Sequence, residues 1–149
     1  MQDTADIVVI GAGAAGLMAS IHAARSAPGA SVVVLDGARK LGAKILIAGG
    51  GRCNVTHDHV DETAFAGSTQ PAIRNVLRRY GVAETVAFFS GLGVELKREE
   101  TGKLFPVTDD ARTVLNALLG EARERGVTIA HPRRVQALRR DSDGFMVST

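Results

Sequence analysis

The stretch IVVIGAGAAG, residues 7–16, decides the fold of this 149-residue chain. The apolar, β-branched run over residues 5–10, which overlaps the start of this stretch, predicts a buried strand. Residues 14–27, after the first two glycines, are rich in helix formers and stop at a Pro-Gly pair, so they predict a helix. A second apolar run over residues 31–35 predicts a parallel partner for the first strand. We therefore expect a right-handed βαβ unit at the start of the chain.

The glycines of this stretch predict a phosphate-binding turn. Gly11 permits the tight turn out of the strand, Gly13 lets the backbone approach a pyrophosphate, and Gly16 lets helix and strand pack closely. The phosphates would lie against the free N–H groups at the helix N-terminus, where Ala14 and Ala15 stand.

An acidic residue follows the second strand at the spacing that a dinucleotide site needs. Asp36 lies about 20 residues after the last of these glycines. Its carboxylate can accept hydrogen bonds from both hydroxyls of an adenosine ribose and would repel a 2′-phosphate, which disfavours NADP at this site. The pattern predicts a dinucleotide-binding fold, and the alternative is a set of glycines that serve only a turn.

A second glycine-rich motif, KILIAGGGRCN, occupies residues 44–54. Three successive glycines raise the entropic cost of ordering the loop, which is typical of a backbone that passes close to a planar or phosphorylated ligand. Arg52 could neutralise a pyrophosphate and Asn54 could hydrogen-bond a ring or ribitol group, although a flexible surface loop explains the same residues. The candidate cofactor-binding residues of this motif are Lys44, Gly50, Gly51, Arg52, Cys53 and Asn54.

The single cysteine and the histidines carry weaker signals. Cys53 excludes an internal disulfide and fits a reducing, cytoplasmic setting. A neighbouring cation could make it a reactive thiolate, but a redox disulfide needs a second cysteine, so we favour a small packed residue. His57 and His59 lie beside two aspartates without a third ligand at helical spacing, and we expect no metal site.

Composition and charge exclude several classes of protein. With 45% apolar and 23% charged residues the chain is globular, and 18 basic against 16 acidic residues leave a net charge of +2, too little for a dedicated nucleic-acid binder. The start carries acids and no base, unlike a signal peptide, and the apolar stretch behind it is too interrupted by glycine to span a membrane. We expect a cytoplasmic protein without an anchor.

The rest of the chain predicts alternating helices and strands. We expect a loop over residues 56–69, helices at 72–80, 82–90 and 109–125, a hairpin at 94–98 and 103–107, and strands at 127–130, 134–139 and 144–148, the last two joined by a turn.

Three segments together resemble a known family: GAGAAG, KILIAGGGRCNVT and GKLFPVTDDARTVLNAL. They are similar to the BaiN/RdsA-like NAD(P)/FAD-dependent oxidoreductases, also called YhiN-type flavoproteins or the aminoacetone oxidase family. The resemblance covers residues 7–147 and departs from the family pattern at Ala48, usually Ser, and His57, usually Asn. It implies an α/β fold, a Rossmann-like FAD-binding domain of the glutathione-reductase-like two-dinucleotide-binding group, with a βαβ start and a later β-meander.

The resemblance also implies functions for particular residues. The first glycine loop would hold the pyrophosphate of FAD, Asp36 the adenosine ribose and residues 50–54 the region near the flavin, while Val135 would offer backbone hydrogen bonds to adenine. NAD(P)H would reduce the flavin, and a small molecule would be the substrate. Because some members are linked to ribosomal RNA modification, RNA is a second candidate partner for the arginines of the C-terminal strands. Alternation along a solvent-facing strand gives the same pattern, and we favour that explanation.

Family members are more than twice as long as this chain. We therefore expect residues 1–149 to be the N-terminal part of the FAD-binding domain, inactive alone, with the rest of that domain and the substrate domain beyond it. No residue of the segment indicates a catalytic role. Two alternatives stay open, namely an NAD-binding dehydrogenase domain and a non-catalytic fragment that holds a dinucleotide.

Overall fold

The computed structural model describes residues 4–149, which fall into two compact units. Of the described residues, unit 1 contains 4–45 and Leu118–Thr149, and unit 2 contains Leu46–Ala117.

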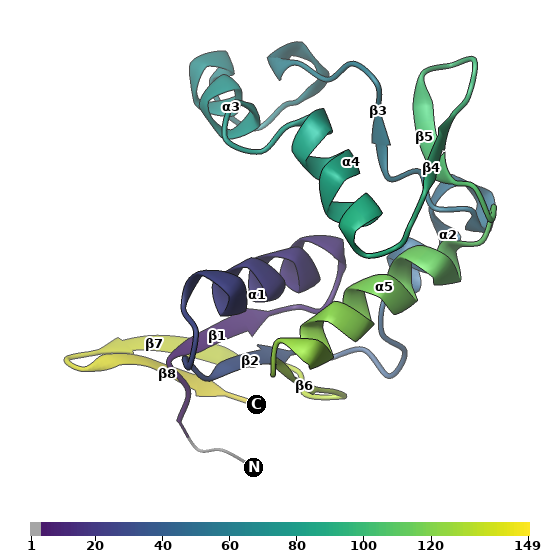
Figure 1. The fold of residues 1–149 in the computed structure, drawn as a ribbon. Helices are drawn as coiled ribbons and strands as arrows, with labels where there is room; N and C mark the ends of the chain where they lie inside the picture. The colour runs from purple at the N-terminus through teal and green to yellow at the C-terminus, as the bar shows by residue number, and fades with distance from the viewer. Residues whose placement is uncertain (1–3) are drawn as a thin grey trace. The chain divides into compact units, whose positions relative to one another are not determined.

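A parallel three-stranded sheet forms the centre of unit 1 (Figure 1). The strand order is β1 (Ile7–Ile10), β2 (Val32–Leu35) and β6 (Thr128–Ala130), and helix α1 (Ala14–Ser26) connects β1 to β2. The expected βαβ unit is therefore confirmed. Hydrogen bonds continue the ladder beyond the strands, because the N–H of residue 11 donates to the carbonyl of residue 35 at 2.7 Å and that of residue 36 to the carbonyl of residue 130 at 3.1 Å.

The core of unit 1 lies on one face of this sheet. Alternate β2 residues, Val32 and Val34, are buried there, together with the α1 residues Leu17 and Ile21, which are fully inaccessible to solvent. On the opposite face the side chains of Val8 and Ile10 of β1 are 39% and 53% exposed. Burial on one face only is why the burial of β1 alternates along the strand.

A nearly buried carboxylate joins α1 to helix α5 (Ala111–Glu124). Glu121, which is 6% exposed, accepts hydrogen bonds from Arg25 at 2.7 and 2.9 Å and from Arg125 at 2.7 Å. The hydrogen bond from Arg125, and then that from Arg25, hold the pKa of Glu121 below its usual range. An ionised carboxylate beside two guanidinium groups can be buried because their charge-assisted hydrogen bonds, all to its Oε1, offset the cost of desolvation.

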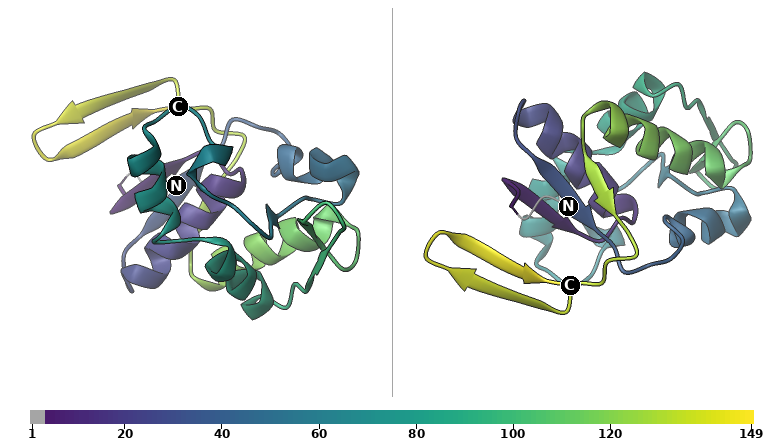
Figure 2. Two further views of the ribbon diagram at one scale, coloured as in Figure 1. Left: turned by 90° about the horizontal axis from the view of Figure 1, so that it is seen from above. Right: turned by 90° about the horizontal axis from the view of Figure 1, so that it is seen from below.

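The last two strands form a separate antiparallel hairpin, β7 (Ala137–Asp141) with β8 (Gly144–Ser148). Figure 2 shows this hairpin extending away from the parallel sheet of unit 1. The expected β-meander is wrong, because β6 pairs with the free edge of β2 and only β7 and β8 pair with each other. Val135 also lies before β7 rather than within a strand, in the irregular segment that follows β6.

Unit 2 is built around an antiparallel sheet of order β3 (Thr56–His57), β5 (Lys103–Pro106) and β4 (Leu96–Arg98). The predicted hairpin is confirmed as β4–β5, and the two predicted helices as α3 (Gln70–Leu77) and α4 (Val82–Gly91). The predicted loop over residues 56–69 instead contains β3 and the short helix η2 (Glu62–Ala64), and the glycine motif begins in helix α2 (Ala43–Ile47) and continues in η1 (Ala48–Gly51).

The core of unit 2 contains three phenylalanines. Phe88 and Phe89 of α4 meet edge to face with ring centroids 5.3 Å apart, and Phe105 of β5 is 2% exposed. Among the helices formed within residues 4–149, none is long and apolar enough to cross a membrane.

The ion cluster of Glu121 generates a stability prediction. We expect Glu121→Gln to lower the free energy of unfolding by about 1–2 kcal/mol at neutral pH, because neutral acceptors bind arginine less strongly. A carboxyl with a depressed folded-state pKa stabilises the fold above its unfolded pKa and loses that contribution as pH falls through the folded value. The difference from wild type should therefore shrink in acid.

Urea unfolding at several pH values measures this difference. The matched control is Glu124→Gln, a change at an exposed position of the same helix, which should behave as wild type. Equal effects of the two variants at neutral pH would contradict the prediction.

Candidate dinucleotide site

Helix α1 begins so close to the end of β1 that Gly16 has no room for a side chain. A Cβ atom on Gly16 would overlap the carbonyl oxygen of Gly11 and lie 2.9 Å from its carbonyl carbon. Gly11 itself has a φ of +100°, a conformation that L side chains rarely adopt. Packing and backbone conformation thus account for these two glycines without a ligand.

Neither packing nor backbone conformation explains why residue 13 is a glycine. Its φ is −77°, and a Cβ atom on it would meet nothing within 4 Å. It is the N-cap residue of α1, where no side chain supplies a capping hydrogen bond and no acid stands in the first turn. Since Ala14 and Ala15 are exposed as well, the positive end of the helix is open to an anion.

Asp36 is fixed beside this turn by backbone hydrogen bonds. The N–H of Ala12 donates to Oδ2 at 2.5 Å and that of Ala38 to Oδ1 at 2.6 Å. Each carboxylate oxygen then keeps further acceptor capacity, because an ionised carboxylate has about four acceptor positions. The residues around α1 therefore fit a dinucleotide, with N–H donors for the phosphates and a carboxylate for ribose hydroxyls.

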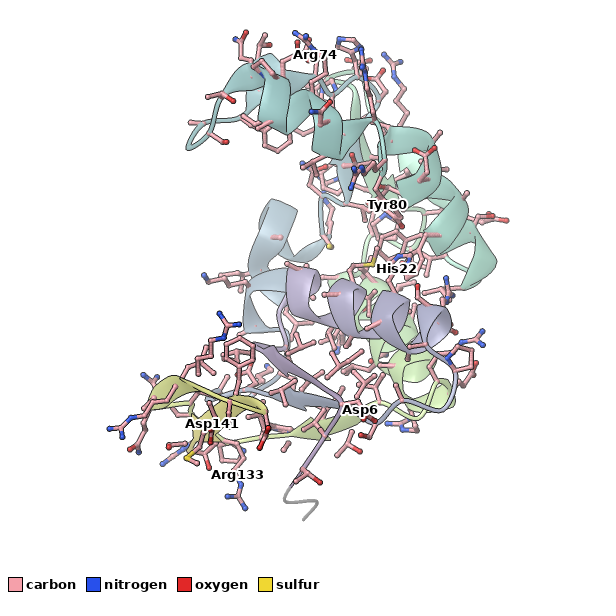
Figure 3. The ribbon with its side chains drawn as sticks, turned by 90° about the vertical axis from the view of Figure 1, so that its left-hand side faces the viewer. Asp6, His22, Arg74, Tyr80, Arg133 and Asp141 are labelled. Carbon is pink, nitrogen blue, oxygen red and sulfur yellow. The ribbon has the colours of Figure 1, made fainter. Side chains whose placement is uncertain are left out.

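The segment that carries Val135 runs next to the end of β2. The N–H of Arg133 donates to the backbone carbonyl of Asp36 at 2.6 Å, and a Cβ atom on Gly37 would lie 3.0 Å from the Cβ of Arg134. Arg133 itself lies at the surface of unit 1 (Figure 3). The structure thus brings the half-buried Val135 into the neighbourhood of Asp36, although outside a strand.

The second glycine loop lies in unit 2 and has an unusual backbone. Gly49 (φ 56°, ψ 34°) and Gly50 (φ 70°, ψ 33°) are left-handed, and Gly51 and Cys53 have φ values of 87° and 63°. The N–H of Cys53 closes the loop on the carbonyl of Ala48 at 2.9 Å. Successive left-handed residues are open to glycine and costly for other residues, which explains the glycine run.

The first two glycines of this loop differ in their surroundings. A Cβ atom on Gly49 would lie 2.6 Å from Cε1 of Phe105 and 2.9 Å from the N atom of Asn54. One on Gly50 would meet nothing within 4 Å, and Gly50 and Asn54 are exposed. Gly49 is therefore required by packing, whereas Gly50 leaves the loop backbone accessible.

Arg52 has partners within unit 2. Its guanidinium forms an ion pair with Glu99, lies 3.6 Å from a carboxylate oxygen of Asp109 and stacks over the ring of Phe105, 4.1 Å from the ring centroid. Sequence reasoning missed these partners. Phe105 and Asp109 lie in the run GKLFPVTDD, whereas Glu99 precedes it. The contact of Arg52 with a pyrophosphate, and the part of the exposed Lys44 in cofactor binding, stay predictions.

Cys53 is buried, with 7% of its surface exposed, and burial raises the pKa of its thiol. A thiol in such an environment stays protonated at neutral pH, which favours the packed interpretation over a reactive thiolate. His57 pairs with Asp58 at 2.9 Å and His59 with Asp61 at 3.5 Å. Within residues 4–149 no three histidine, cysteine or acidic side chains are grouped so that they could hold a metal ion.

The whole of this sequence region also matches the model of a protein family. The model of the HI0933-like protein Rossmann domain matches residues 5–149. The chain belongs to this family. The family resemblance and the Rossmann-like α/β fold expected from the sequence are thereby confirmed.

Two curated relatives carry names that describe reductive chemistry or RNA modification. The chain is 40% identical over 141 residues to the 3-dehydro-bile acid delta(4,6)-reductase of Clostridium scindens, a match that covers 95% of the chain and 34% of the relative. It is 31% identical over 140 residues to the ribosomal RNA dihydrouridine synthase of Escherichia coli, covering 94% of the chain and 34% of the relative. The chain thus spans about a third of the length of these relatives.

Two solved structures share the fold. The 3-ketosteroid-delta4-(5alpha)-dehydrogenase from Rhodococcus jostii matches with a TM-score of 0.67 at 22% identity, over 97% of this chain and 42% of that one. THI4 from Thermovibrio ammonificans matches with a TM-score of 0.62 at 16% identity, over 96% of this chain and 45% of that one.

The contact between Gly16 and Gly11 generates a second prediction. We expect Gly16→Ala to destabilise the fold by about 3 kcal/mol or more, because a methyl group there overlaps backbone atoms that cannot move without shifting β1. The control is Gly120→Ala in α5, where a Cβ atom would meet nothing within 4 Å. The control should raise stability by about 0.5–1 kcal/mol through helix propensity. Thermal unfolding followed by circular dichroism measures both, and similar midpoints for the two variants would contradict the prediction.

Proposed function

We propose that the protein is an FAD-dependent oxidoreductase and that unit 1 binds the ADP part of FAD. The observation that carries this proposal is the open N-terminus of α1, uncapped and free of acids in its first turn, beside a carboxylate fixed at the end of the neighbouring strand. Family membership supports it, because the matched domain is a Rossmann domain.

The residues of unit 1 would bind and orient the dinucleotide. The N–H groups at the start of α1 would donate to the pyrophosphate, whose approach Gly13 leaves open. Asp36 would accept hydrogen bonds from the ribose hydroxyls while its loop contacts hold it in place. The backbone at Val135 would contact adenine, and the neighbouring bond from Arg133 to Asp36 would keep that segment near the ribose.

The flavin would supply the redox chemistry when bound, since its ring system accepts and returns electrons. We assign residues 50–54, including Cys53, to the flavin part of the cofactor, and we keep Lys44 as a cofactor-binding residue. As reductant we propose NAD(P)H, and as substrate a small molecule, because the relative at 40% identity is named as a reductase of a bile acid derivative. We place the enzyme in the cytoplasm and its substrate-binding residues outside the present chain, which spans 34% of that relative.

RNA is the second candidate substrate, favoured by the name of the relative from Escherichia coli. The arginines that would contact RNA include Arg139 and Arg140, which are exposed on β7. The same hairpin also carries acidic residues at its turn, including Asp141 (Figure 3), so its charge is mixed. A small-molecule substrate remains the interpretation that we prefer.

The identity of the bound cofactor distinguishes an FAD-dependent oxidoreductase from an NAD-binding dehydrogenase domain. Heat denaturation of the purified protein should release a yellow, fluorescent compound if FAD is bound, and a colourless nucleotide if the site holds NAD. Anaerobic addition of NADH or NADPH should then bleach the bound flavin. Binding of FAD without bleaching by either would support the non-catalytic alternative and contradict an NAD(P)H-reduced enzyme.

Gly13 offers the sharpest mutational test of the cofactor site. We expect Gly13→Ala to fold normally, because the added methyl group meets no protein atom, and to weaken FAD binding at least tenfold through lost contacts to the pyrophosphate. Thermal unfolding of the apoprotein and fluorescence titration with FAD measure the two effects. Wild-type FAD affinity in this variant would contradict the placement of the pyrophosphate at this turn.

A further inference from the structure

The hairpin β4–β5 of unit 2 contacts the second glycine loop. We propose that this hairpin holds the loop in its ligand-ready shape, with Phe105 and Glu99 as positioning residues for flavin binding. The inference rests on the proposed function, since it assigns the accessible side of this loop to FAD. It gives a function to the run GKLFPVTDD, which the cofactor site leaves unexplained.

Phe105 contacts the loop at two points. The edge of its ring lies so close to Gly49 that a Cβ atom there would be 2.6 Å from Cε1, and its face carries the guanidinium of Arg52, 4.1 Å from the ring centroid. Phe105 is 2% exposed, so its ring belongs to the core of unit 2. One aromatic side chain thereby fixes the beginning of the glycine run and the residue that follows it.

Glu99 and Asp109 fix the guanidinium of Arg52 from the two ends of the hairpin. Glu99 lies between β4 and β5, where its N–H donates to the carbonyl of Lys103 at 2.9 Å, and its carboxylate pairs with Arg52. Asp109 follows β5, approaches Arg52 at 3.6 Å and also pairs with Lys97 of β4. The hairpin therefore supplies both the aromatic surface and the carboxylates that orient Arg52.

The same hairpin holds the chain that leaves the loop. The N–H of Val55 donates to the carbonyl of Leu104 at 2.9 Å, and β3 then pairs with β5 through Thr56 opposite Leu104. The bond from Cys53 to Ala48 thus joins the two ends of the glycine run, and the chain that follows the run is attached to β5.

A packed core alone does not need this arrangement. Consecutive glycines in left-handed conformations make a loop with high entropy in the unfolded chain and many alternatives when unsupported. Fixing such a loop before the ligand arrives reduces the ordering cost of binding. Because Gly50 faces open space while Gly49 faces Phe105, the hairpin supports one side of the loop and leaves the other accessible.

The first experiment compares two adjacent carboxylates in the purified FAD-bound protein. Glu99→Gln removes the charge that pairs with Arg52, whereas Glu100→Gln alters an exposed neighbour. We expect Glu99→Gln to weaken FAD binding about tenfold and to change the visible absorption bands of the bound flavin, because Arg52 loses one of the two carboxylates that orient it over the ring. Glu100→Gln should match wild type, and the apoproteins of both should unfold at similar temperatures.

The second experiment separates positioning from core stability. Phe105→Leu and Phe88→Leu each remove a buried ring from unit 2, so both should lower the unfolding midpoint of the apoprotein. Only Phe105→Leu should also weaken FAD binding and alter the flavin spectrum. Equal loss of FAD affinity in both variants would show a merely structural effect and overturn the inference.

The outcomes also distinguish this inference from the proposed function. A wild-type protein that binds no FAD would overturn both. A wild type that binds FAD, with unchanged affinity and spectrum in Glu99→Gln and Phe105→Leu, would overturn the positioning function alone and leave the proposed function intact.

Discussion

The close crossing of α1 over the end of β1 is the constraint on which unit 1 depends. Since the carbonyl oxygen of Gly11 occupies the place of a side chain on Gly16, the helix can start at the carboxyl edge of the sheet. The positive end of the helix then lies at the same edge of the sheet as Asp36, which follows β2. Backbone atoms, rather than flexible side chains, place the anion-attracting group and the acid next to each other.

The carboxylate of Asp36 is held within the turn beside the helix N-terminus. Its charge is met by the N–H groups of Ala12 and Ala38, at 2.5 and 2.6 Å, so the acid stabilises the turn that forms the site. The glycines of the loop in unit 2 fall into the same two kinds. Gly49, like Gly16, has no room for a side chain, whereas Gly50, like Gly13, has open space and leaves the backbone accessible.

Local features of this chain could be predicted from the sequence, and long-range choices could not. The βαβ unit, the turn at Gly11 and the carboxylate of Asp36 follow from periodicity and turn chemistry within a short window. The pairing of β6 with β2 joins Val33 to Thr128, and no local signal distinguishes it from a meander with β7. The ion pair of Arg52 with Glu99 has no local signal either, because a guanidinium suits phosphate and carboxylate alike and Glu99 lies 47 residues away.

For the described residues we propose binding and orientation of a cofactor. Burial keeps the thiol of Cys53 protonated, and Arg52 is engaged by two carboxylates. What unit 1 and unit 2 each offer is a backbone surface held in one shape, by a helix crossing in the first and by a hairpin in the second. A bound cofactor that carries its own reactivity needs from its protein this kind of fixed surface, because binding and orientation are then the protein's contribution.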